Sequence, residues 1–152
     1  MTTREDPATT HVFLRIEHDT AKPEVVSGIL GITPNHSVRS GQLPTGGRGE
    51  PYPWNVWVLA SMWAVQSKDV RAHFQWLLSA IGTRGSELQT LREQGYRMEI
   101  HCLWMGRGGY GGPELTPDLL RALSNLGVGV YFDVGILAQS TPTSGGSGRT
   151  AQ

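Results

Sequence analysis

Residues 116–134 read TPDLLRALSNLGVGVYFDV and predict a helix followed directly by a strand. Thr116 is a good N-cap, Pro117 suits the first helical position, and Gly127 suits the left-handed residue that ends many helices. Apolar residues recur at helical spacing between these signals, and from residue 128 onward apolar and other residues alternate as in a half-buried strand. The apolar positions are Leu119, Leu120, Leu123 and Leu126 in the helix and Val128, Val130, Phe132 and Val134 in the strand.

The same order of elements occurs near the start of the chain. Residues 11–17 alternate as a half-buried strand, and residues 22–31 predict a short helix that begins at Pro23 and ends at Gly31. Residues 96–105 alternate again and predict the strand that precedes the helix at residue 117. The chain therefore contains two strand–helix–strand halves, one near each end.

Between the halves, the sequence predicts an edge strand, a long loop, a central strand and two helices. Residues 54–61 are rich in aromatic and β-branched side chains, as is typical of a strand. Apolar spacing predicts helices over residues 69–81 and 86–94, which form a pair joined at residues 82–85. This order predicts an α+β fold of ferredoxin-like type. Its antiparallel or mixed sheet would have four or five strands, helices on one face, and the helical pair between the two halves.

Length and composition predict one domain over residues 11–138. Residues 1–10 show no periodicity, and residues 139–152 are rich in Gly, Ser and Thr, so both ends are expected to be disordered. The 13 basic and 13 acidic side chains balance, which argues against non-specific binding to nucleic acid or to a membrane surface. The single cysteine, Cys102, excludes an intramolecular disulfide, and no apolar segment is long enough to span a bilayer. A cytoplasmic location is the simplest expectation.

One face of the predicted sheet carries a mixture of polar and aromatic side chains. Such a face could bind a protein partner or a polar ligand, and carboxylates near His101 could perform general acid–base chemistry. The alternative is that the face is merely solvated, as antiparallel sheets often are. The strand around Trp57 is partly apolar on both faces, which would fit a central strand covered on both sides or a homodimer interface. The candidate binding face comprises Arg15, Glu17, Trp57, Glu99, His101, Tyr131 and Asp133.

Other motifs give weaker signals. The glycine-rich segment at residues 106–113 precedes a helix, as phosphate-binding loops do, but it lacks the Gly-Lys-Ser/Thr ending and is better interpreted as a connector. The five histidines are scattered without metal-ligand spacing, and Cys102 alternates onto the apolar face as a core residue. The sequence therefore predicts no metal, no cofactor and no assignable catalytic residue.

Several segments in the same order resemble a largely bacterial family, domain-of-unknown-function family 4279. They include residues 13–16, the turn at 29–34, the step at 39–41, the strand at Trp54, the helix around 74–78, the helix start at 115–120 and the strand at 132–134. The resemblance implies an α+β fold and no established activity.

The expected function is binding rather than catalysis. The leading hypothesis is a non-catalytic intracellular domain that binds a protein partner, for example an immunity-type protein that occupies a toxin. The alternative is a regulatory domain that binds a small ligand, since ferredoxin-like sheets often bind metabolites at dimer edges. The third hypothesis is a small enzyme that uses Glu17, Glu99, His101 or Asp133.

Overall fold

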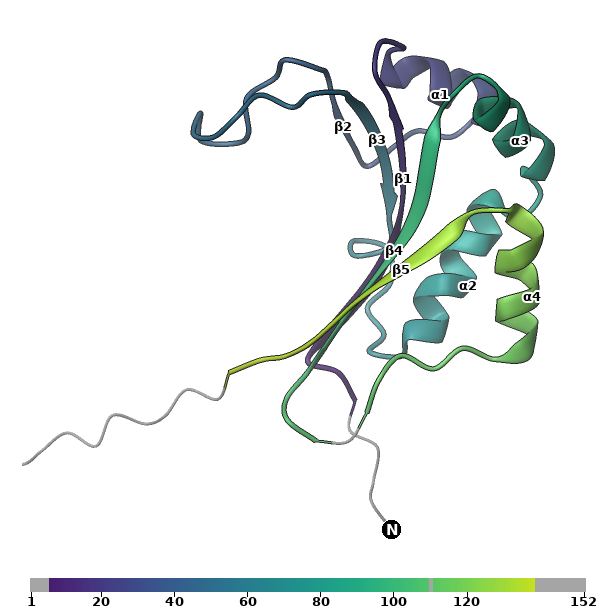
Figure 1. The fold of residues 1–152 in the computed structure, drawn as a ribbon. Helices are drawn as coiled ribbons and strands as arrows, with labels where there is room; N and C mark the ends of the chain where they lie inside the picture. Colours follow the sequence, from purple (N-terminus) through teal and green to yellow (C-terminus); the bar gives the residue numbers. More distant parts are fainter. Residues whose placement is uncertain (1–5, 110, 139–152) are drawn as a thin grey trace, which may run out of the picture.

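A computed structural model of the chain describes residues 6–109 and 111–138, so the tail predicted at residues 139–152 lies outside the described residues. The fold is α+β, with a five-stranded sheet whose one face is covered by four helices (Figure 1). In chain order the elements are β1 (Thr9–His18), α1 (Pro23–Leu30), β2 (His36–Val38), β3 (Asn55–Ala60), α2 (Val70–Ile81), α3 (Gly85–Glu93), β4 (Arg97–Gly106), α4 (Pro117–Leu126) and β5 (Gly129–Ile136).

The sheet is mixed, with strand order β2-β3-β1-β4-β5. The pairs β1–β3, β1–β4 and β2–β3 are antiparallel, and β4–β5 is parallel. The two strand–helix–strand halves are both present, but they differ in arrangement. Strands β1 and β2 are separated by β3, whereas β4 and β5 are direct neighbours because α4 crosses over to the adjacent position. The predicted helical pair, α2 and α3, connects β3 to β4.

The helix ends follow the signals in the sequence. The Thr116 side chain accepts a hydrogen bond from the backbone N–H of Leu119, and Pro117 occupies the first position of α4. Helices α1 and α4 both stop at a glycine in the left-handed conformation, Gly31 with φ of 66° and Gly127 with φ of 65°. Side chains with a Cβ rarely adopt this conformation, so glycine here sets where each helix ends.

The hydrophobic core lies between the sheet and the helices. Inward-facing residues of the central strands meet the apolar stripes of all four helices, as the alternation predicted. Cys102 is one of these core residues, and burial raises the pKa of its thiol to about 12. A thiol that stays protonated and buried is a packing residue rather than a nucleophile. The fully buried strand residues are Val12, Leu14, Ile16, Trp57, Ile100 and Cys102.

Strand β5 departs from the expected burial. Val128, just before the strand, is buried, but Phe132 and Val134 are exposed although they share the helix-side face with Cys102 and Trp104. Figure 1 shows β5 running away from α4 toward its C-terminal end. Alternation predicts which face a side chain takes, but it does not predict how far a helix extends over that face.

Candidate functional site

The face of the sheet opposite the helices, here called the open face, is organised by strand register into rows of side chains. One row crosses four strands and contains Ala60, Phe13, His101 and Tyr131. The next contains Val58, Arg15 and Glu99, and the third contains Val56, Glu17 and Arg97. The open face is therefore apolar over β3 and polar over β4.

Six of the seven predicted site residues share this face. Trp57 does not: the prediction that it belongs to the binding face is wrong. Trp57 pairs with Ile16 in the register, is fully buried on the helix side, and donates from its indole Nε1 to the Ser27 hydroxyl of α1 at 3.0 Å. Because both sets of alternating residues in β3 are largely apolar, periodicity alone could not assign their faces. The residues on the open face are Arg15, Glu17, Glu99, His101, Tyr131 and Asp133.

A polar cavity of about 300 Å³ lies over the β1–β4 half of the open face. Its charged groups are largely paired with one another. Glu17 forms ion pairs with Arg15 and, at 3.6 Å, with Arg97, while the His101 Nε2 lies 3.1 Å from a Glu99 oxygen. The cavity therefore combines acids, an imidazole and guanidinium groups within a balanced network. Its lining residues are Arg15, Glu17, Arg97, Met98, Glu99 and His101.

His101 lies between two aromatic rings. Its imidazole stacks on Phe13 with ring centroids 4.8 Å apart, and the Tyr131 ring lies 5.3 Å away on the neighbouring strand. Burial lowers the pKa of His101, and the Arg15 charge acts in the same direction. The nearby carboxylates, led by Glu99, partly oppose the shift. The ring is therefore mainly neutral at pH 7, with one nitrogen able to donate and the other to accept.

An apolar groove of about 340 Å³ occupies the other half of the open face. The sequence did not point to it, because its walls come from β1, β2 and β3 together with loop residues that have no periodic pattern. Trp63 and Met62 follow β3 directly and remain 64% and 46% exposed. Arg15 lines both this groove and the polar cavity. The groove is lined by His11, Phe13, Arg15, His36, Val38, Tyr52, Val56, Val58, Ala60, Met62 and Trp63.

The segment that connects β2 to β3 borders this groove. It leaves the sheet on the side opposite the helices and forms a projecting arm (Figure 1), from which Tyr52 contributes to the groove. The arm is held at its base, where the Gly41 N–H donates to the Tyr52 carbonyl and the Tyr52 N–H donates to the Gln42 carbonyl. The open face is therefore bounded on one side rather than flat.

A buried serine–histidine pair joins the residue that follows β3 to helix α2. The Ser61 hydroxyl lies 2.7 Å from the His73 Nδ1 and accepts a hydrogen bond from the Val12 N–H. The other ring nitrogen of His73 lies 2.6 Å from the Ser67 carbonyl, which can only accept, so this nitrogen donates the hydrogen bond. Both side chains are almost completely buried. The pair resembles a nucleophile and its base in geometry, but its position makes it a structural link between β1, β3 and α2.

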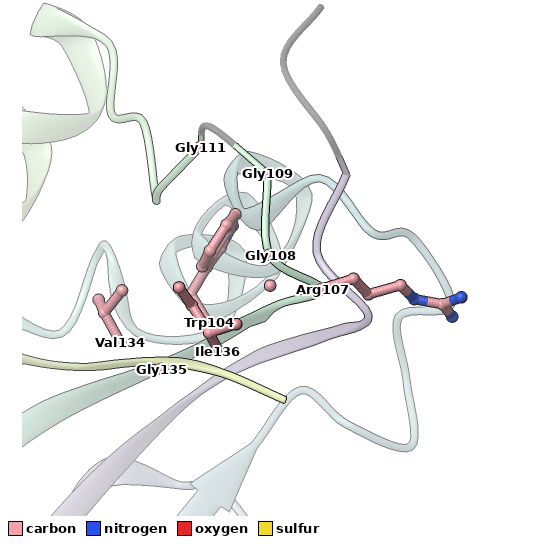
Figure 2. A pocket seen from close by; sticks show the side chains of 9 residues that line it. Trp104, Arg107, Gly108, Gly109, Gly111, Val134, Gly135 and Ile136 are labelled. Carbon is pink, nitrogen blue, oxygen red and sulfur yellow. The ribbon is translucent and has the colours of Figure 1, made fainter. Parts of the chain in front are cut away.

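The glycine-rich loop after β4 borders a smaller pocket of about 210 Å³. Figure 2 shows the side chains of Trp104, Val134 and Ile136 around this pocket, while Arg107 extends away from them. A phosphate would find no cationic side chain directed at it from the described residues.

Within residues 6–109 and 111–138, no three His, Cys, Asp or Glu side chains are grouped so that they could hold a metal ion. None of the helices in the described part of the chain is both long enough and apolar enough to cross a membrane.

Comparison with known proteins identifies the family. The sequence profile of the family described as Domain of unknown function (DUF4279) matches residues 8–137. This range includes all the strands and helices of the described structure. No curated protein and no solved structure gives a significant match. The chain belongs to the DUF4279 family.

Proposed function

We propose that this domain is a non-catalytic binding domain that holds a protein partner on the open face of its sheet. The observation that carries the proposal is the apolar groove with Trp63 and Met62 exposed at its border. Tryptophan and methionine are enriched in the buried centres of protein interfaces, and charged residues commonly form the surrounding rim. The polar cavity next to the groove supplies such a rim.

The charges around the groove indicate what kind of partner segment fits. Its described lining includes the guanidinium of Arg15, which also pairs with Glu17, the imidazoles of His11 and His36, and no carboxylate. An apolar side chain flanked by Asp or Glu would therefore match the groove in shape and accept hydrogen bonds from these groups without meeting a like charge in the described lining. An immunity-type protein, which neutralises a toxin by occupying it, is one form of this function.

Site-specific photo-cross-linking tests the proposal. A photoreactive amino acid would replace Trp63 in the full chain, and the same residue at Gln89, on the exposed side of α3, is the matched control. We expect a partner that is trapped from position 63 and not from position 89. The purified partner should then bind Trp63→Ala at least about tenfold more weakly, as expected for an aromatic anchor, and bind Gln89→Ala normally. Equal trapping from both positions, or full affinity of Trp63→Ala, would overturn the proposal.

A small-ligand regulatory domain is the second candidate, because the groove and the polar cavity meet at Arg15. The interleaved order of β1 to β4 supports a ferredoxin-like core, a fold whose sheets often serve ligand binding. The ligand that fits is an anion with an aromatic body. Thermal-shift measurements with a panel of aromatic carboxylates separate the two candidates: stabilisation of the unmodified protein that is lost in Arg15→Gln would favour the ligand.

Catalysis ranks third. Of the four residues that could perform acid–base chemistry, Glu17, Glu99 and His101 line the polar cavity and Asp133 does not. Glu17 is also engaged by two arginines. The arrangement contains a candidate base, His101, but no geometry that singles out a reaction.

A further inference from the structure

Strand β5 forms one edge of the sheet, and its hydrogen-bonding pattern can be read from a single bond at its end. The Leu137 N–H donates to the Gly106 carbonyl of β4 at 2.8 Å. Because N–H and C=O groups of successive strand residues point to opposite sides, the odd-numbered residues of β5 bond to β4. The even-numbered residues direct their N–H and C=O groups outward. Among the described residues, no strand pairs with this edge.

The same even-numbered residues carry the exposed apolar side chains of the strand. Phe132 is 39% exposed, Val134 50% and Ile136 67%. Natural proteins usually protect an edge strand with lysine, proline or a bulge, because unpaired main-chain groups recruit other strands. The sequence of β5, GVYFDVGI, contains neither lysine nor proline. An edge whose outward-bonding residues Val130, Phe132, Val134 and Ile136 are all apolar is suited to pairing with another strand.

We propose that two copies of this chain associate through their β5 strands, which pair antiparallel about a two-fold axis and join the two sheets into one. A two-fold axis perpendicular to the sheet leaves the open faces of both copies on the same side of the joined sheet. Residues that lie opposite each other must then have side chains on the same face, so even-numbered residues pair with even-numbered residues. The outward N–H and C=O groups of Phe132 in one copy then bond to the C=O and N–H groups of an even-numbered residue in the other copy.

The register of this pairing is selected by the charges that it places opposite each other and by the length of strand that it pairs. Centring the axis on Phe132 places Tyr131 opposite Asp133, once on each side of the axis, and pairs nearly the whole strand. Centring it on Asp133 would place two carboxylates directly opposite each other, which is unfavourable in a cross-strand pair. Centring it on Val134 would leave the first half of the strand unpaired. The register centred on Phe132 is therefore favoured.

This contact is independent of the proposed function. The groove lies over β1, β2 and β3 on the open face, whereas β5 is at the opposite edge of the sheet. An edge-to-edge dimer would leave both open faces accessible, on the same side of the joined sheet. Each dimer would therefore present two copies of the proposed binding face.

The oligomeric state of the full chain tests the proposal by size-exclusion chromatography with light scattering. At about 100 µM, above the micromolar dissociation constants of modest interfaces, we expect twice the chain mass of 16.6 kDa. Phe132→Lys and Val134→Pro should both give the monomer, since the first adds a charge to the edge and the second removes an outward N–H. Circular dichroism should show that both variants remain folded. Trp63→Lys, on the open face, is the matched control and should stay dimeric.

Disulfide trapping tests the register. Under mild oxidation, Phe132→Cys should form a reducible covalent dimer across the axis, while Ile136→Cys should not, because its counterpart in the partner is near residue 128. The native Cys102 is buried and should not contribute. The proposal would be overturned if the unmodified protein were monomeric, or if its dimer survived both edge variants. It would also be overturned if Trp63→Lys abolished the dimer, or if disulfide trapping were stronger at position 136 than at position 132. Loss of dimerisation in Trp63→Lys would instead indicate pairing through the open faces.

Discussion

The imidazole of His101 and the phenyl ring of Phe13 lie parallel across two neighbouring strands, with centroids 4.8 Å apart and planes 2° apart. The two residues are direct cross-strand partners, and Tyr131 follows in the same row. This packing withdraws the imidazole from water at the junction of the polar and apolar parts of the open face. Its protonation state is therefore coupled to the integrity of the sheet.

Folding stability should fall as the pH decreases through about 6.5. Burial holds the pKa of His101 below its usual 6.5, so between the two values the unfolded chain binds more protons than the folded chain. The stabilisation is therefore present above pH 6.5 and is lost below it. Arg15 adds to the shift, whereas Glu99, Glu17 and Asp133 oppose it. Urea denaturation at pH 7.5 and 5.5 should show the loss, and His101→Gln should reduce it.

His11 supplies the control for this prediction, because burial also lowers its pKa and it contributes in the same direction. His11→Gln should leave part of the pH dependence, and the double variant should remove more than either single variant. Direct titration of the His101 ring by NMR should give a midpoint below that of an unfolded peptide. A midpoint above 6.5 would show that the carboxylates dominate over burial and would reverse the predicted sign.

Two tryptophans near β3 should differ sharply in their effect on stability. Trp57→Ala removes a fully buried ring together with its hydrogen bond to Ser27, and should cost about 3–5 kcal/mol of unfolding free energy. Trp63→Ala removes a ring that is 64% exposed, and should change stability by less than about 0.5 kcal/mol. Chemical denaturation of both variants at one pH provides the comparison. Similar losses would mean that Trp63 is covered in the isolated protein, contrary to the structure.

The two tryptophans also show how far the sequence could predict the site. Alternation assigns a strand residue to a face when one set is polar and the other apolar, and this contrast correctly placed Arg15, Glu99 and His101. In β3 both sets of alternating residues are largely apolar, so the face of Trp57 depends on its pairing with Ile16, a residue far away in the sequence. Trp63 lies in a loop, and its contribution to the groove depends on tertiary structure that no periodicity describes.

The fold was more predictable than the site because its signals are local. Proline at the helix starts and glycine at the helix ends predicted where α1 and α4 begin and end in the sequence. The spacing of hydrophobic residues predicted the positions of the helical pair. Strand β1 begins at Thr9 rather than at His11, because the Thr10 side chain and the Ala8 N–H both bond to β4. Those bonds extend the strand beyond its apolar pattern.

The buried link between Ser61 and His73 should contribute to stability. Ser61→Ala leaves the Val12 N–H and the His73 ring nitrogen without their buried partner, which should cost about 1–3 kcal/mol. Ser124→Ala, on the exposed side of α4, is the matched control and should change stability by less than about 0.5 kcal/mol. Equal effects of the two substitutions in urea denaturation would indicate that water replaces the serine hydroxyl.

The alternation of hydrogen bonds along β5 predicts opposite effects for prolines at adjacent positions. Asp133→Pro removes an N–H that bonds to β4 and should destabilise the fold by about 1–3 kcal/mol, the cost of leaving the β4 carbonyl without its partner. Val134→Pro removes an outward N–H, which an edge strand tolerates, so it should retain most of the unfolding free energy. Both variants should be compared in dilute protein, so that association of copies does not contribute to the measured stability. If Val134→Pro were the more damaging of the two, the outward edge would belong to the odd-numbered residues, and the pairing register centred on Phe132 would be wrong.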